Sequence, residues 1–261
     1  MKLKIYQVDA FTDKLFSGNS AAICPLDKWL PVPTMMGIAS ETNQSATAFF
    51  VQEGKGFYIR WFSPAAELHL CGQATLAAAH ILYTEEGYKG KEIHFNSQSG
   101  DLIVKKDGDY ITLNFPIDTI ERVKTPAELS IALNIKPQEC FKGQMDFMLV
   151  YKSEKEILNL KPNFYAMKRI RARGFACTAK GTKSDFVSRF FAPSHGIDED
   201  SVTGSAHATL IPYWSKILGK KQMSAMQLST RGGHLNCLDL GDRVEISGQA
   251  RTFMRGEIEI N

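Results

Sequence analysis

The stretch RWFSPA at residues 60–65 recurs as RFFAPS at residues 189–194, which is 129 positions further along the chain. Three more segments recur in the same order, displaced by 132, 133 and 133 positions: ELHLCGQA at 67–74 as EDSVTGSA at 199–206, SGDL at 99–102 as GGHL at 232–235, and YITL at 110–113 as RVEI at 243–246. A period of about 130 residues is too long for a solenoid. We therefore interpret the chain as two similar halves.

The two halves share one order of expected elements. Alternating β-branched and aromatic residues predict strands, and Ala- and Leu-rich runs predict helices: strands at 57–62 and 185–191, helices at 73–83 and 205–218. The run at 74–79 is apolar on every side, which favours a helix enclosed by a rolled sheet. We expect an α/β (α+β) fold with two pseudo-symmetric half-domains, each a curved mixed sheet rolled around a central helix.

The boundary between the half-domains is expected near residues 115–126, where the strand pattern of the first half ends in Phe115-Pro116. This gives a first half-domain at residues 1–117 and a second at residues 118–261. The tail of the second half-domain is free to return to the first.

Composition excludes several classes of protein. The 261 residues include 31 Lys+Arg and 28 Asp+Glu, for a net charge of +3, and 44% are hydrophobic, as in an ordinary globular protein. So small a net charge provides no broad field for nucleic acid or an anionic membrane, and neither is expected as a partner. The local exception is the basic run KRIRAR at 168–173, for which a solvated surface is favoured over a phosphate-binding patch.

The start of the chain and the cysteines indicate a reduced, cytoplasmic protein. The opening MKLKIYQVD alternates like a strand and reaches Asp9 before an apolar signal core forms, and the longest mostly apolar run, at 74–83, is far shorter than the roughly 18 residues of a membrane span. The five cysteines are scattered without a C-x-x-C pair, and the six histidines have no metal-ligand spacing. We expect no disulfide framework, metal or cofactor.

In both halves the chain leaves a strand, turns through a glycine, Gly72 or Gly204, and enters a helix. A helix start presents unpaired N–H groups and a partial positive charge, and glycine allows a ligand to approach the backbone closely. If the halves pair about a pseudo-two-fold axis, both starts face one cleft suited to a small carboxylate or a developing enolate. Tight turns without a ligand are the alternative, and we weigh the two equally.

No complete nucleotide, phosphate-loop, zinc-protease or serine-hydrolase motif occurs.

Five segments together resemble the PhzF-type family of phenazine-biosynthesis proteins nearly end to end: VDAFT at 8–12, FSGNSAA at 16–22, NQSATAF at 43–49, LCGQATLA at 70–77 and EDSVTGSAH at 199–207. The resemblance implies the diaminopimelate-epimerase-like fold with the active site between its halves. It also implies cofactor-free proton transfer on a small carboxylic acid, which is cyclic in one known case. Family members of this kind are usually homodimers, so a homodimer is implied as well.

The chain departs from the family pattern at the residues that would transfer protons. Where the pattern has its proton-shuttling glutamate the chain has Ala46, where it has histidine the chain has Gln73, and where it has an aspartate the chain has His69. Asp200 is retained, although Ser201 replaces the proline that follows it in the pattern. Alanine and glutamine cannot exchange a proton, and losing a positioned acid or base typically costs about 10²–10⁴-fold in rate.

The resemblance therefore implies a site with Asp200 as its main acid or base, beside the substituted positions Ala46 and Gln73. Ligand-binding residues are expected at both glycine turns and in the loop before Ala46: Ser45, Gly72, Thr203, Gly204 and Ser205.

Three functions fit these residues. The favoured one is an isomerase in which Asp200 titrates, with Glu41 or His69 as a second group. The second is a non-catalytic protein that binds a small acid. The third is an epimerase or racemase that uses Cys71, although the matching place in the second half is Thr203 instead of a second cysteine.

For the other candidates a structural role competes with a functional one. His207 either faces the ligand or packs inside, and Ser45 either contacts the ligand or caps its own backbone. For Arg60 and Arg189, which occupy matching strand positions, structural ion pairs are favoured over catalysis.

Overall fold

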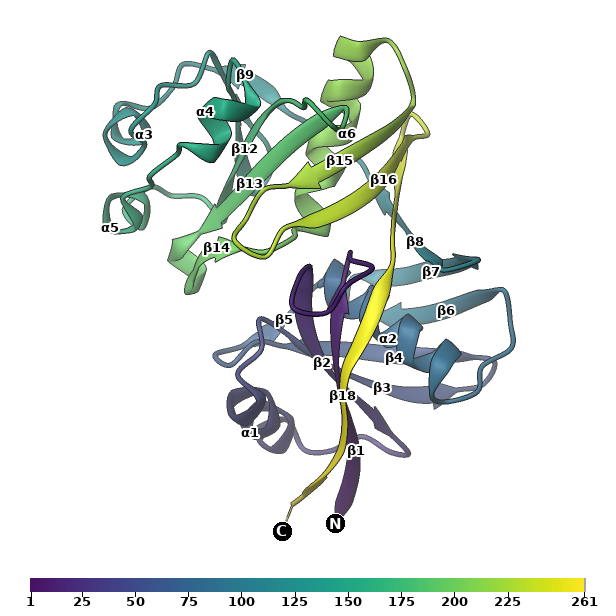
Figure 1. Ribbon diagram of the computed structural model, residues 1–261. Coiled ribbons are helices and arrows are strands. Elements are labelled where there is room, and N and C mark those ends of the chain that lie inside the picture. Colours follow the sequence, from purple (N-terminus) through teal and green to yellow (C-terminus); the bar gives the residue numbers. More distant parts are fainter. Residues whose placement is uncertain (261) are drawn as a thin grey trace. The chain divides into compact units, whose positions relative to one another are not determined.

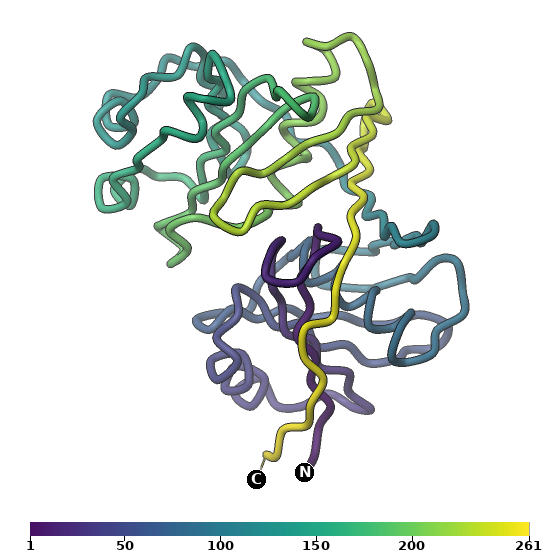
Figure 2. The backbone as a smooth tube through the Cα atoms, viewed as in Figure 1, coloured from purple at the N-terminus to yellow at the C-terminus, as the bar shows by residue number. Residues whose placement is uncertain are grey.

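The structure is a computed structural model that describes residues 1–260. The chain divides into two compact units: unit 1 comprises Met1–Asn114 together with the chain from Ser247 onward, and unit 2 comprises Phe115–Ile246. In Figures 1 and 2 the yellow C-terminal segment runs beside the purple N-terminal segment, so unit 1 contains both ends of the chain.

Unit 1 is built on one mixed sheet (Figure 1). Its strands pair in the order β18 (Ala250–Glu259), β1 (Lys2–Ala10), β2 (Asn19–Leu26), β3 (Thr47–Glu53), β4 (Gly56–Phe62), β6 (Glu92–Ser97), β7 (Gly100–Asp107) and β8 (Tyr110–Pro116). The β2–β3 and β4–β6 pairs are parallel, and the other pairs in this order are antiparallel. A short strand, β5 (Glu67–Leu68), adds to β4.

Unit 2 repeats this pattern of pairing. Its strands pair in the order β9 (Glu121–Val123), β10 (Glu139–Lys142), β11 (Asp146–Val150), β12 (Gly174–Lys180), β13 (Phe186–Ala192), β15 (Gln222–Gln227) and β16 (Gly233–Asp239). Parallel pairs again occur at the third and fifth junctions, β11–β12 and β13–β15, and β14 (Ile197–Asp200) adds to β13 as β5 does to β4. β17 (Arg243–Gly248) leads from β16 to β18.

Each unit has one long helix in the corresponding place, α2 (Gly72–Thr84) between β5 and β6, and α6 (Gly204–Leu218) between β14 and β15. Both predicted helices are confirmed, and each begins one residue earlier than predicted, at a glycine. Ten of the 13 residues of α2 are buried because it packs against β1, β2, β3 and β18. The two predicted strands are also confirmed, as β4 and β13, and with them the predicted α/β fold class.

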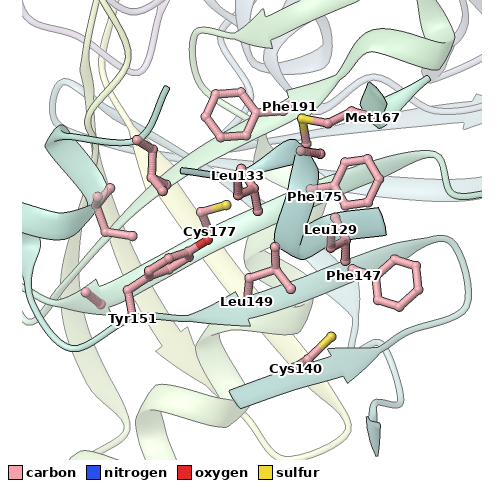
Figure 3. Close-up of a cluster of buried hydrophobic side chains, with 14 of the residues drawn as sticks. Leu129, Leu133, Cys140, Phe147, Leu149, Tyr151, Met167, Phe175, Cys177 and Phe191 are labelled. Carbon is pink, nitrogen blue, oxygen red and sulfur yellow. The ribbon is translucent and has the colours of Figure 1, made fainter. Parts of the chain in front are cut away.

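Shorter helices complete the two cores. In unit 1, α1 (Val32–Thr42) packs on β3 and β4. In unit 2, α3 (Ala127–Ala132), α4 (Glu154–Leu158) and α5 (Phe164–Met167) enclose the cluster of Figure 3, where the rings of Phe147 and Phe175 stack 6.0 Å apart. Among residues 1–260, no helix combines the length and the apolar character that crossing a membrane requires.

All five cysteines are buried free thiols. Burial raises the pKa of Cys177, in the Figure 3 cluster, to about 12 and that of Cys140 to about 11. These two side chains therefore act as small apolar groups in the core of unit 2.

The repeated strands carry a repeated ion pair. In unit 1, Arg60 Nε and Nη2 donate to the two carboxylate oxygens of Glu67 at 2.7 and 2.8 Å. In unit 2, Arg189 Nε and Nη2 donate to those of Glu199 at the same two distances. The expectation that both arginines form structural ion pairs is confirmed. The second pair holds β14, the strand that ends in Asp200, against β13.

We expect the Arg189–Glu199 pair to be strongly coupled, because the two side chains are only 13% and 18% exposed. Either Arg189→Met or Glu199→Gln leaves one charge poorly solvated and should lower the free energy of unfolding by on the order of 3 kcal/mol. The double variant should lose less than the sum of the two single losses, as measured by urea denaturation. Strictly additive losses would contradict this coupling.

Candidate functional site

In unit 1, the loop that enters β3 carries the first candidates. Ala46 is fully buried, and its carbonyl oxygen accepts a hydrogen bond from the N–H of Ala22 at 3.0 Å. The Ser45 hydroxyl lies 3.2 Å from Asn19 Oδ1 and 3.1 Å from the carbonyl oxygen of Ser20. Ser45 therefore ties its loop to the start of β2, a contact with residues distant in sequence that differs from the capping of its own backbone considered from the sequence.

The start of α2 holds the second group of unit 1. Cys71 is the N-cap residue in an extended conformation, and Gly72 and Gln73 are the first two helical residues. The first intrahelical bond runs from the Thr75 N–H to the Cys71 carbonyl at 3.0 Å, so the N–H groups of the preceding helical residues have no acceptor within the helix. Gln73 is 9% exposed and Cys71 6%.

Two further candidates of unit 1 point into solvent. The side chain of His69 is exposed. The backbone of His69 is held by a 2.6 Å hydrogen bond that the Ser99 hydroxyl donates to the His69 carbonyl oxygen. Glu41 is exposed near the end of α1, which stops at Thr42 because Asn43 turns left-handed at φ 49°. The helix that would have carried Glu41 toward Ala46 is therefore interrupted.

In unit 2, Asp200 lies at the end of β14, four residues before α6. It is 9% exposed, and its Oδ2 accepts a hydrogen bond from the Thr203 hydroxyl at 2.6 Å. Gly204 is buried and begins the helix, and Ser205 is partly exposed. The structure thus brings together four of the residues predicted for the second half: Asp200, Thr203, Gly204 and Ser205.

Sequence reasoning missed Gln227, which fixes this turn. Its side chain is 1% exposed, donates through Nε2 to the Asp200 carbonyl at 2.8 Å and accepts from the Thr203 N–H at 2.9 Å through Oε1. The residue lies at the end of β15, far from the turn in sequence, and no local motif marks it. Only the parallel pairing of β15 with β13 brings the amide to this place.

We expect Gln227→Leu to destabilise the protein, because the Thr203 N–H and the Asp200 carbonyl would each lose the hydrogen bond to the Gln227 amide. Leaving a buried polar group unsatisfied costs about 1–3 kcal/mol. Urea denaturation measures the loss, and Gln222→Leu at the exposed start of the same strand is the matched control. Equal stability of the two variants would show that the amide does not hold the turn.

His207 packs inside unit 2, which decides between its two predicted roles. Its side chain is fully buried, with Nδ1 2.8 Å from the Thr203 carbonyl and its ring 5.9 Å from that of Phe186. Because a carbonyl only accepts, Nδ1 carries the proton of the neutral ring, and Nε2 has no partner. Burial, opposed by the bond to Thr203, lowers the pKa of His207 to about 4.

This buried histidine should make the protein less stable in acid. The histidine takes up its proton near pH 6.5 in the unfolded chain and only near pH 4 in the folded chain. The stability that the neutral His207 contributes to the folded state is therefore complete above pH 6.5 and is lost as the pH falls toward 4. The expected loss is up to about 3 kcal/mol. In His207→Asn, whose amide can still donate to Thr203, urea denaturation should show a smaller decline over this range. An unchanged decline would contradict the assignment.

Arg173 is a second residue that the sequence did not single out for the site. It donates through Nε to Asp146 Oδ1 at 2.9 Å and through Nη2 to Oδ2, and its guanidinium lies 5.7 Å from the centroid of the Phe190 ring. Phe190 is in turn the strand partner of Asp200. Although burial opposes it, the hydrogen-bonded carboxylate of Asp146 raises the pKa of Arg173, and the charge of Asp200 adds to this rise. A fixed positive charge therefore lies within electrostatic reach of the Asp200 carboxylate.

Within residues 1–260, no three His, Cys, Asp or Glu side chains gather closely enough to hold a metal ion. What the described groups supply is a carboxyl group, hydroxyls and helix N–H groups.

Comparison with known proteins gives consistent matches over the full chain. Residues 8–256 match the profile of the family described as phenazine biosynthesis-like protein. A protein of Pseudomonas aeruginosa named an uncharacterized isomerase is 44% identical over 261 residues, with 100% of each chain covered. A phenazine biosynthesis protein of the PhzF family from Enterococcus faecalis has a crystal structure that matches with a TM-score of 0.97 at 44% identity, covering 100% of both chains. A predicted epimerase of P. aeruginosa shares the fold, with a TM-score of 0.76 at 17% identity over 99% of this chain and 100% of that one.

Proposed function

Because the chain belongs to the phenazine biosynthesis-like (PhzF) family of isomerases, we propose that it moves a proton on a small carboxylic acid with Asp200 as the acid and base. The observation that carries this proposal is the construction of the Asp200 turn. One carboxylate oxygen accepts a hydrogen bond from the Thr203 hydroxyl, the Gln227 side chain bonds the Asp200 carbonyl and the Thr203 N–H, and α6 begins at the next residue, Gly204.

In the proposed reaction, Asp200 takes a proton from a carbon atom that lies between a carboxyl or carbonyl group and a C=C bond. The electron pair of the broken C–H bond spreads into a dienolate. Asp200, after exchanging its proton with solvent, returns a proton to the far carbon of the dienolate, so that the C=C bond moves into conjugation. The negative charge that develops is stabilised by N–H groups at a helix start, where no reorganisation is needed. No oxidant, reductant or cofactor enters this balance.

The remaining predicted site residues are proposed to bind the substrate. Ser205 and the N–H groups at Gly204 would hold its anionic group beside Asp200, and Thr203 orients the carboxylate. On unit 1, Ser45 and Gly72 are proposed ligand contacts. Ala46 and Gln73 occupy the positions of the family glutamate and histidine, and neither side chain can carry a proton.

A second candidate function, a protein that only binds a small acid, is favoured by the same two side chains, Ala46 and Gln73. Incubating the unmodified protein in D₂O with a panel of small cyclic acids, one of them a dihydro-hydroxyanthranilate, separates the two. Deuterium appearing on a substrate carbon supports the isomerase. Saturable binding by calorimetry without deuterium uptake supports the binding protein.

The family resemblance also leads us to propose a homodimer. Light scattering of the purified chain tests this state, and a monomer mass at all concentrations would contradict it.

A further inference from the structure

The basic run at residues 168–173 lies at a groove of about 760 Å³ on unit 2. Three segments line this groove: the turn at 142–145, the basic run itself, and the last two residues of the short 3₁₀ turn Pro193–His195. The lining includes five positively charged residues, one histidine and no acidic residue: Lys142, Lys168, Arg169, Arg171, Arg173 and His195.

Two carboxylates near the groove are already engaged. Asp146 is 6% exposed and holds Arg173 in a two-fold hydrogen-bonded pair. Asp118 accepts from the Gln144 N–H at 3.3 Å and from the Thr209 hydroxyl at 3.2 Å. Asp146 balances the charge of Arg173, and Asp118 keeps its negative charge because its two donors are neutral. The five positive charges of the lining therefore still exceed the two nearby negative charges by three.

Four of these positive charges have no ion-pair partner in the described chain. Among residues 1–260, no ion pair reaches Lys142, Lys168, Arg169 or Arg171, whereas Arg122, Arg173, Arg189 and Lys220 of the same unit each have one. The Lys142 ammonium lies 4.2 Å from the centroid of the Phe147 ring, which fixes it without neutralising it. Concentrated positive charge in a concave surface attracts an anion.

The composition of the lining indicates what kind of anion fits. Arg169 and Arg171 offer planar guanidinium forks, which match the oxygens of phosphate, and a phosphate monoester carries up to two charges. Met145 and Ile170 add apolar surface between the charged groups. A ligand with a phosphate group and a small apolar body would satisfy both parts of this lining.

We propose that this groove binds a small molecule that carries a phosphate group. The proposal goes beyond the isomerase reaction, because it rests on the lining of the groove, which shares only Arg173 with the surroundings of Asp200 and includes neither Asp200 nor the start of α6. It also gives a role to a basic run for which the sequence alone favoured a solvated surface.

Calorimetry with phenyl phosphate in 150 mM NaCl tests the proposal, with inorganic phosphate and benzoate as comparison ligands. We expect saturable binding of phenyl phosphate, weaker binding of inorganic phosphate because it lacks the apolar body, and the weakest binding of benzoate because it has a single charge. Absence of phenyl phosphate binding at millimolar concentration would overturn the proposal.

A pair of double variants shows whether the groove is the binding site. Arg169→Ser with Arg171→Ser should weaken phenyl phosphate binding at least tenfold. Lys180→Ser with Lys183→Ser removes the same charge from exposed positions at the other end of β12, and should weaken it less than threefold. Equal weakening by both pairs would show a general charge effect and contradict the proposal. Binding of duplex DNA or anionic vesicles in place of phenyl phosphate would contradict it as well.

Discussion

Replacing Asp200 with asparagine is expected to lower the turnover of a substrate by about 10²–10⁴-fold, because the amide cannot accept and return a proton. Asparagine keeps the shape of the side chain, and its Oδ1 can still accept the hydrogen bond that Thr203 donates to the carboxylate. The fold should therefore persist. Turnover is followed by chromatography of substrate and product, and the free energy of unfolding by urea denaturation.

Asp198→Asn is the matched control for this variant. Asp198 lies two residues earlier on the same strand, β14, and its side chain is exposed, so the same chemical change is made without touching the turn at Thr203. The control should keep its turnover. If Asp200→Asn also keeps the unmodified rate, Asp200 serves only to accept the Thr203 hydrogen bond and hold the turn before α6, a role that the asparagine Oδ1 can also fill.

The double variant Ala46→Glu with Gln73→His is expected to raise isomerase activity toward a dihydro-hydroxyanthranilate by about 10²-fold or more. Both changes would restore titratable side chains at the two positions where we place the family glutamate and histidine. The Ala46 side chain is fully buried, so a glutamate there would be poorly solvated and its pKa should rise toward neutrality, which suits a group that exchanges protons. Turnover by the unmodified and the double-variant proteins is compared directly.

Ala46→Gln with Gln73→His is the control for the restored glutamate, since glutamine has the same shape and cannot carry a proton. It should show no comparable gain. Its free energy of unfolding also separates the cost of filling the buried position from the effect of charge. Substantial and equal activity of the unmodified protein and the glutamate variant would show that Ala46 is no handicap.

The repeat in the sequence was sufficient to predict the fold class and the main elements. The match of RWFSPA with RFFAPS placed Arg60 and Arg189 in corresponding strands. In the structure each of these arginines forms a bidentate pair with a glutamate, Arg60 with Glu67 and Arg189 with Glu199. Local pattern also located α2 and α6. The α2 run is apolar around the whole helix, a surface that only burial inside a sheet accommodates, and α6 follows an Ala- and Leu-rich run after its glycine.

The surroundings of Asp200 could not be predicted, because they depend on contacts between segments distant in sequence. Gln227 reaches the turn only through the pairing of β15 with β13, and Arg173 approaches it only through the ring of Phe190. The buried position of His207 was equally beyond local pattern. The residue is the fourth of α6, and which face of that helix is enclosed depends on the sheet around it.

The central claim is that Asp200 carries a proton between the substrate and the solvent. The most direct test is a time course by NMR in D₂O, with one substrate and three proteins: the unmodified chain, Asp200→Asn and Asp198→Asn. We predict that the unmodified chain and Asp198→Asn place deuterium on the same substrate carbon at similar rates, and that Asp200→Asn places none above the uncatalysed rate. Deuterium uptake by Asp200→Asn at the unmodified rate would contradict the claim.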